Sequence, residues 1–193
     1  MKPISAAELL DLTAYEKARP ALVARIIEHK RPRRVLVGSE LCFVFEDRES
    51  VRFQIQEMMR TERIVDDERI AEEVAVYNEL VPGEHELSAT LLIEIREADR
   101  IRPMLDKLVG IDEHVRLEIG GQAVRATFDP GQFEDDRISA VHYIRFPLGA
   151  QLAARFRDPA VLAELVVEHP NYVNRTALTG AARASLARDL EPA

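Results

Sequence analysis

The chain has 193 residues and a formal net charge of −8, and 47% of its residues are hydrophobic. This composition is typical of a globular protein, and the length predicts a single domain over residues 1–193. The negative charge argues against general nucleic-acid binding, which depends on cations that neutralise phosphates. The first twenty residues lack the apolar core of a signal peptide, and no segment has the ~20 apolar residues that cross a bilayer. We therefore expect a soluble, cytoplasmic protein without membrane association.

Helical and extended patterns alternate in the first half of the chain. The expected elements are a helix over 13–30, strands over 34–38 and 41–46, a helix over 50–63, and a helix from Asp66 or Asp67 through Tyr77. Gly38 and Ser39 separate the two β-rich runs and predict a hairpin. Polar capping residues mark the start of the later helix.

The second half contains more extended segments. The expected elements are a strand over 89–95, a helix over 97–108, strands over 115–119 and 123–128, an acidic loop over 129–137, a strand over 138–146, a helix over 150–157, a strand over 165–168 and a helix over 174–189. Gly120 and Gly121 are typical of a two-residue hairpin turn. Together these patterns predict an α+β fold, with helices packed on a mostly antiparallel sheet.

Common motifs of catalysis and cofactor binding are absent from the sequence. Neither GxGxxG nor GxxxxGK[ST] occurs, so no familiar nucleotide-binding motif is present. The motifs GxSxG, HExxH, CxxC and ExxH are also missing. The single cysteine, Cys42, lies in the apolar run LCFVF and is expected to be buried. One cysteine cannot hold an iron–sulfur cluster of its own.

The segment over residues 43–64 combines core-forming residues with many hydrogen-bonding groups. Glu46 and Asp47 end the strand just before the helix begins. Gln54 and Glu57 share one face of this helix, since they lie three residues apart. A second face carries further polar side chains, namely Gln56, Arg60 and Arg63.

Two interpretations of this segment remain open. Glu57 could converge with another carboxylate, from Glu46, Glu73 or Glu94, to form an acid–base pair or a cradle for a divalent metal. Alternatively, Glu57 and Arg60, and Glu62 with nearby arginines, form ordinary surface pairs, which is the favoured interpretation. The first interpretation, a shared polar site, would be supported if one pocket held five of these residues: Glu46, Gln54, Glu57, Glu94 and His142.

The histidines allow a related metal hypothesis. His142 lies within the strand ISAVHYIRF and His169 lies in VVEHPNY, and either could join Glu57 as a ligand. A hydrogen-bonded structural role is favoured for both. His29 lies beside Lys30 and Arg31 and is expected to be exposed.

Two other groups of residues receive structural interpretations. The densest basic cluster comprises Lys30, Arg31, Arg33 and Arg34, and is interpreted as a solvated helix end. Tyr77 and Asn78 close a helix, where asparagine can adopt the left-handed conformation.

Several motifs resemble one bacterial family. FEDRESVRFQIQEMMRTERI, EEVAVYNELVP, ATLLIE, VHYIRF and EHPNY follow one another in the order typical of domain of unknown function 3501, over roughly residues 9–172. The resemblance implies an uncharacterised protein whose relatives are encoded beside rubrerythrin-like proteins and iron–sulfur oxidoreductases. It thereby implies a role in peroxide defence or electron transfer. The site residues that match its pattern are Glu46, Asp47, Gln54, Gln56, Glu57, Arg60, Glu62, Tyr77, Asn78, Glu94, His142 and His169.

Three functional hypotheses follow. The leading one is an accessory or binding protein that supports a redox protein partner through the polar site. The second is a metal-dependent enzyme or metalloprotein that uses clustered glutamate and histidine residues. The third is a structural protein that forms a homo-oligomer.

Overall fold

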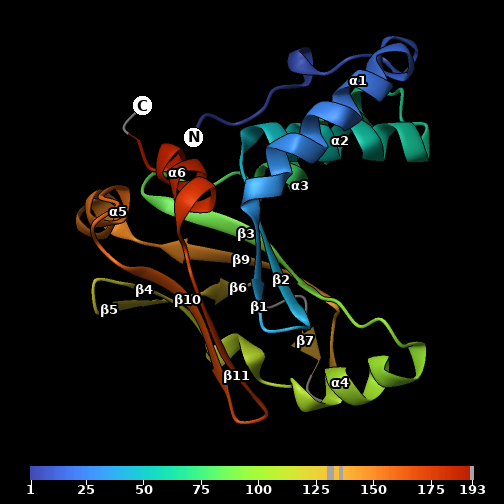
Figure 1. Ribbon diagram of the computed structural model, residues 1–193. Helices are drawn as coiled ribbons and strands as arrows, with labels where there is room; N and C mark the ends of the chain where they lie inside the picture. Colours follow the sequence, from blue (N-terminus) through green and yellow to red (C-terminus); the bar gives the residue numbers. More distant parts are fainter. Residues whose placement is uncertain (130–132, 135–136, 192–193) are drawn as a thin grey trace.

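Two antiparallel sheets and a group of three helices make up most of the computed structural model, which describes residues 1–129, 133–134 and 137–191 (Figure 1). The first sheet has the order β1-β2-β3-β9-β6. Its strands are β1 Arg34–Val37, β2 Leu41–Glu46, β3 Glu86–Ile93, β9 Val141–Pro147 and β6 Thr127–Phe128. The β1–β2 hairpin turns at Gly38, whose φ of +72° is left-handed and suits glycine.

The second sheet packs against the inner face of the first. Its order is β11-β10-β4-β5, with β11 Tyr172–Ala177, β10 Ala163–His169, β4 Val115–Ile119 and β5 Gln122–Arg125. Phe43 and Leu91 from the first sheet share a buried core with Leu117 and Leu165 from the second. A short separate pair is formed by β7 Phe133–Glu134 and β8 Arg137–Ile138.

The helices α1 Leu12–Lys30, α2 Arg48–Glu62 and α3 Asp67–Asn78 gather at one end of the first sheet (Figure 1). They enclose a second apolar cluster that includes Val51, Ile55 and Met59 of α2. These residues are spaced four apart along α2, so they lie on one side of the helix and form its apolar face. Tyr143 of β9 packs against this cluster and joins the helices to the sheet.

The remaining helices lie around the two sheets. They are α4 Ile101–Lys107, α5 Gly149–Arg157 and α6 Gly180–Asp189, with four short 3-10 turns, η1 Ala6–Glu8, η2 Arg31–Arg33, η3 Ala98–Arg100 and η4 Ile111–Glu113. Helix α6 packs beside η2, which places this helix next to the start of β1. Among the residues described, no helix combines the length and apolarity required to cross a membrane.

The predicted α+β class and the antiparallel pairing are confirmed, but several segments differ from expectation. The helix expected over 174–189 is wrong in its first part, because β11 continues to Ala177 and α6 begins at Gly180. Strand β11 pairs with β10 along its whole length, and its residues alternate in burial as a strand at a sheet surface does. This tertiary pairing overrides the local preference for a helix.

The expected strand over 123–128 is divided between β5 and β6, which belong to different sheets. The helix over 97–108 is divided into η3 and α4. The expected acidic loop over 129–137 contains strand β7 and the first residue of β8, and its residues 130–132 and 135–136 lie outside the described residues. The strand expected over 138–146 is divided between β8 and β9.

Candidate functional site: a buried arginine network beside a groove

The junction between β2 and α2 is built by a reciprocal cap. The Asp47 carboxylate accepts a hydrogen bond from the Ser50 N–H at 2.9 Å, and the Ser50 hydroxyl accepts one from the Asp47 N–H at 2.9 Å. These bonds satisfy backbone donors that a helix start leaves unpaired. The strand therefore ends at Glu46, and both acids are held where β2 meets α2.

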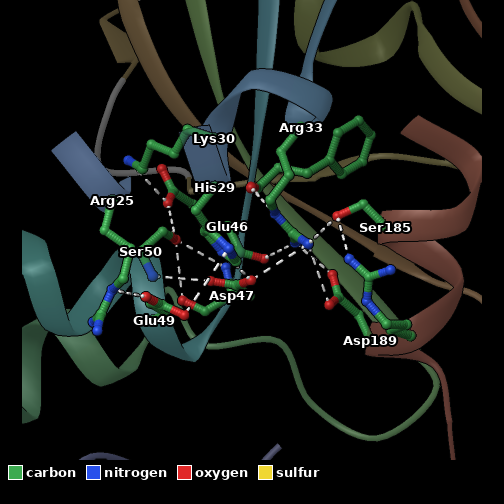
Figure 2. A network of polar contacts seen from close by, with 12 residues as sticks. Arg25, His29, Lys30, Arg33, Glu46, Asp47, Glu49, Ser50, Ser185 and Asp189 are labelled. Atoms are coloured by element: carbon green, nitrogen blue, oxygen red, sulfur yellow. Dashed lines mark hydrogen bonds and ion pairs between the residues drawn. The ribbon is translucent and has the colours of Figure 1, made fainter. Parts of the chain in front are cut away.

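Arg33 lies at the centre of a buried network beside this junction, and only 1% of its surface is exposed (Figure 2). Its guanidinium donates to the carbonyl oxygens of Phe45 at 2.9 Å and Glu46 at 3.0 Å. It also donates to the Asp189 carboxylate at 2.5 and 3.3 Å, and lies 3.3 Å from the Asp47 carboxylate. One side chain thus joins the end of β2, the start of α2 and helix α6.

The two carboxylates that flank Arg33 have opposite pKa shifts. Burial acts to raise the pKa of Asp47, but Arg33, the Ser50 N–H and His29 outweigh it and lower that pKa. His29 Nε2 lies 2.7 Å from Asp47 Oδ2. Burial raises the pKa of Asp189, and the nearby charge of Asp47 adds to that effect. Asp47 is therefore the more firmly ionised acid of the two.

Glu46 connects the network to a groove. The residue is 2% exposed, and its carboxylate accepts hydrogen bonds from Thr90 at 2.8 Å and from the Ser50 hydroxyl. Lys30 Nζ lies 3.5 Å away, on the groove side. This buried acid is thus paired with two hydroxyls and one cation.

The groove beside Glu46 has a volume of about 570 Å³ and lies between α1, α2 and the first sheet. Apolar side chains line much of it, namely Ile26, Ile27, Val44 and Leu92. Lys30, Arg31 and Arg34 add three cations to its wall. Gln54 of α2 also lines the groove, and its amide nitrogen is buried with no hydrogen-bond partner among the described residues.

A second cavity of about 660 Å³ lies under α2 and α3. Tyr143 lines both cavities, so they meet at this side chain. Gln54 lines the first and Met58, one helical turn later, lines the second. Tyr77 and Glu73 of α3 form part of the second cavity, opposite Arg145 of β9.

The predicted convergence of five residues occurs only in part. Glu46 and Gln54 line one groove, and Glu94 lies at its edge through a 2.6 Å ion pair with Arg34. Glu57 lies elsewhere on α2, where it accepts hydrogen bonds from Arg19 at 2.7 and 2.8 Å and from Tyr15 at 2.7 Å.

The favoured interpretation of the remaining charges on α2 agrees with the geometry. Arg60 Nε lies 3.5 Å from Glu57 Oε1, and Glu62 lies 3.9 Å from Arg69. Arg19 holds the pKa of Glu57 down to about 2, assisted by the Tyr15 hydroxyl. Glu57 is therefore an ionised partner in a salt bridge rather than a shared proton site.

Two predicted amides anchor the N-terminal segment. The Gln56 amide exchanges hydrogen bonds with the backbone of Leu10 at 2.6 and 3.1 Å. The Asn78 amide does the same with Ile4 at 2.8 and 2.9 Å. Asn78 is the last residue of α3 and is not left-handed, so the expected conformation is wrong.

The residues proposed as metal ligands do not converge. His142 is fully buried and alternates with Tyr143, so it points to the opposite face of β9 from the groove. Its pKa is lowered by burial. His169 Nε2 lies 3.0 Å from the Val109 carbonyl oxygen. Within the described residues, no group of three or more histidine, cysteine, aspartate or glutamate residues is arranged to hold a metal ion.

Sequence reasoning missed three residues of the network: His29, Arg33 and Asp189. Arg33 is buried, so the interpretation of the whole basic cluster as a solvated helix end is wrong for this residue. The expected exposure of His29 is also wrong, since its side chain is 24% exposed and bonded to Asp47. Pro32, at the start of η2, was the available signal that the helix does not simply continue into solvent here.

The comparisons with known proteins point to a family of unknown function. No curated protein matches the chain. A crystal structure of a "novel protein of unknown function" from Burkholderia pseudomallei K96243 is 35% identical, with a TM-score of 0.91, and the match covers 98% of this chain and 100% of that one. A family model described as "Protein of unknown function (DUF3501)" matches residues 3–190. The chain therefore belongs to this family, as its motifs indicated.

Proposed function

We propose that this protein is a binding protein that holds a small amphipathic anion in the groove between α1, α2 and the first sheet. The observation that carries the proposal is the Gln54 amide nitrogen, which is buried and has no hydrogen-bond partner among the described residues, on a side chain that lines the groove. An unpaired buried donor costs about 1–3 kcal/mol, and an acceptor on a bound ligand would remove that cost. Pockets that combine apolar walls with a few polar groups are typical of small-molecule sites.

The charges around the groove support an anionic ligand. Arg31 and Arg34 have side chains that are 72% and 44% exposed, and each pairs with a surface glutamate. Exposed pairs of this kind contribute only about 0–1 kcal/mol, so a ligand carboxylate or sulfonate can replace the glutamate at little cost. The apolar part of such a ligand would rest on Val44 and Leu92.

In this proposal the Arg33 network holds one wall of the groove in place and takes no part in catalysis. Its carboxylates are held by the guanidinium, by a helix cap and by hydroxyl groups. A general acid or base needs a proton that can be exchanged with a substrate. Glu46 reaches the groove, but Thr90 and Ser50 already donate to its carboxylate.

The accessory role in a redox system remains a prediction that rests on the gene neighbourhood implied by the family. Cys42 does not add to it, because the thiol is buried and burial raises its pKa. A cytoplasmic location, a redox partner and a homo-oligomer are likewise predictions. A pull-down under reducing and oxidising conditions tests the redox partner, and failure to recover one in either condition counts against it.

The proposed function can be tested with 8-anilinonaphthalene-1-sulfonate, an amphipathic anion whose fluorescence rises in apolar sites. We expect saturable binding at one site, weakened at least fivefold by Arg34→Glu, or about 1 kcal/mol. Arg102→Glu is the matched control, because Arg102 is also exposed and ion-paired but lies on α4. The neutral analogue N-phenyl-1-naphthylamine should bind more weakly. Equal effects of the two substitutions, or no saturable binding, would refute the proposal.

A further inference from the structure

The second cavity differs in chemistry from the groove, although Tyr143 lines both. Its volume is about 660 Å³, large enough for a small organic molecule. Met58 and Leu80 provide apolar walls on the helical side. Three aromatic residues line it among those described: Tyr77 from α3 on the helical side, and Tyr143 from β9 and Phe128 from β6 on the sheet side.

Among the described residues that line this cavity, acidic side chains outnumber basic ones. Arg145 is its one basic lining residue among those described, and Glu86 forms a close ion pair with it. Glu73 and Glu79 also line the cavity, and neither has an ion-pair partner among the described residues. The groove on the other side of Tyr143 has three cations in its wall, so the two cavities favour ligands of opposite charge.

Tyr77 lines the cavity together with Tyr143 and the acid Glu73. Burial raises the pKa of Tyr77, and the neighbouring Tyr143 and Glu73 raise it further. The faces of aromatic rings attract organic cations, and a nearby carboxylate strengthens that attraction. Glu73, Tyr77 and Tyr143 are all half-buried. Solvent therefore screens their attraction for a cation less than it would screen that of fully exposed side chains.

We infer that the cavity under α2 and α3 binds an organic ammonium ion, with the charged group near Tyr77, Tyr143 and Glu73 and the apolar part against Met58 and Leu80. The inference does not depend on the anion groove, because different residues carry it apart from Tyr143. An alkylammonium or quaternary ammonium group fits better than a bare metal ion, since aromatic and apolar side chains form much of the wall.

Isothermal titration calorimetry with choline tests the inference, and 3,3-dimethylbutan-1-ol serves as the neutral carbon isostere. We expect one saturable site for choline and binding about tenfold weaker for the isostere, as the cation–π and carboxylate contributions predict. Glu73→Gln should weaken choline binding severalfold. Glu72→Gln is the matched control, because Glu72 is the preceding residue on α3 and is exposed outside the cavity.

Three results would overturn the inference: absence of saturable choline binding, equal affinity for the neutral isostere, or equal effects of the two glutamine substitutions. Tyr143→Leu provides a second variant, and it should weaken choline binding while Tyr143→Phe retains it. Circular dichroism and urea unfolding confirm that each variant is folded. Titration of the Glu73→Gln variant with 8-anilinonaphthalene-1-sulfonate separates the two sites, because loss of choline binding alone leaves the anion groove intact.

Discussion

Replacing Arg33 with methionine should destabilise the fold by about 3–5 kcal/mol, the range for breaking a buried ion pair by removal of one partner. The substitution removes the cation that pairs with Asp47 and Asp189, whose side chains are only 10% and 6% exposed. It also leaves the carbonyl oxygens of Phe45 and Glu46 without their guanidinium donor. Domains have total stabilities of about 5–15 kcal/mol, so this loss is a large fraction of the whole.

Urea unfolding followed by circular dichroism measures this loss as a lower midpoint with an unchanged slope. Arg34→Met is the matched control, since Arg34 is the next residue but is 44% exposed and makes one surface ion pair, with Glu94. It should cost no more than about 1 kcal/mol. Similar losses for the two methionine variants would show that the Arg33 network does not bear the stability assigned to it.

The dependence on pH provides a second test of the same variant. Without Arg33, the pKa values of Asp47 and Asp189 in the folded state should both rise, because each loses a cation and stays buried. A folded state with raised carboxyl pKa values takes up protons before the unfolded state does. The difference in free energy of unfolding between wild type and Arg33→Met should therefore become smaller as the pH falls from neutral towards 5. A deficit that grows over this range would contradict the assignment.

Three further predictions concern other parts of the molecule. Glu57→Gln should lower the free energy of unfolding by about 1 kcal/mol in urea at neutral pH. Arg19 lowers the pKa of Glu57 from 4.5 to about 2, so the salt bridge stabilises the fold fully above pH 4.5. The cost of the substitution should therefore vanish as the pH falls to 2. The Cys42 thiol should react with an aromatic disulfide reagent only when the protein opens, and rapid modification of the folded protein would disprove its burial. Asn78→Ala removes both hydrogen bonds to Ile4, so it should cost about 1–3 kcal/mol and accelerate proteolysis of the N-terminal segment, while unchanged proteolysis would show that the segment is held by other contacts.

The elements predicted most successfully are those with strong local signals. The hairpin over β1 and β2 follows from two β-rich runs around Gly38, and α3 begins after Asp66, whose carboxylate caps the helix. The error over 174–189 has a different origin. Pairing of β11 with β10 provides hydrogen bonds and side-chain contacts across the hairpin, and no local helix preference reveals that partner.

The Arg33 network could not be predicted because its members are far apart in sequence. Asp189 lies 156 residues from Arg33, and the contact exists only after α6 packs beside η2. A run of basic residues normally signals a solvated surface, since arginine is rarely fully buried without a partner. The burial of Arg33 among exposed neighbours is thus a tertiary property, set by which of the basic residues in η2 and β1 faces α6.

The many polar residues of the segment over 43–64 have separate structural roles. The geometry does not gather them into a single catalytic cluster. Asp47 caps α2, Gln56 anchors the N-terminal segment and Glu57 pairs with Arg19. Each of these polar groups has its partner within the fold. Gln54 is different, because its amide nitrogen is buried beside the groove without such a partner. Arg60 Nε on the same helix also has no hydrogen-bond partner among the described residues, but it lies 3.5 Å from the Glu57 carboxylate, which balances its charge. Gln54 lines a groove instead, and for this reason we propose the binding site beside Gln54 and not at the acids of the segment.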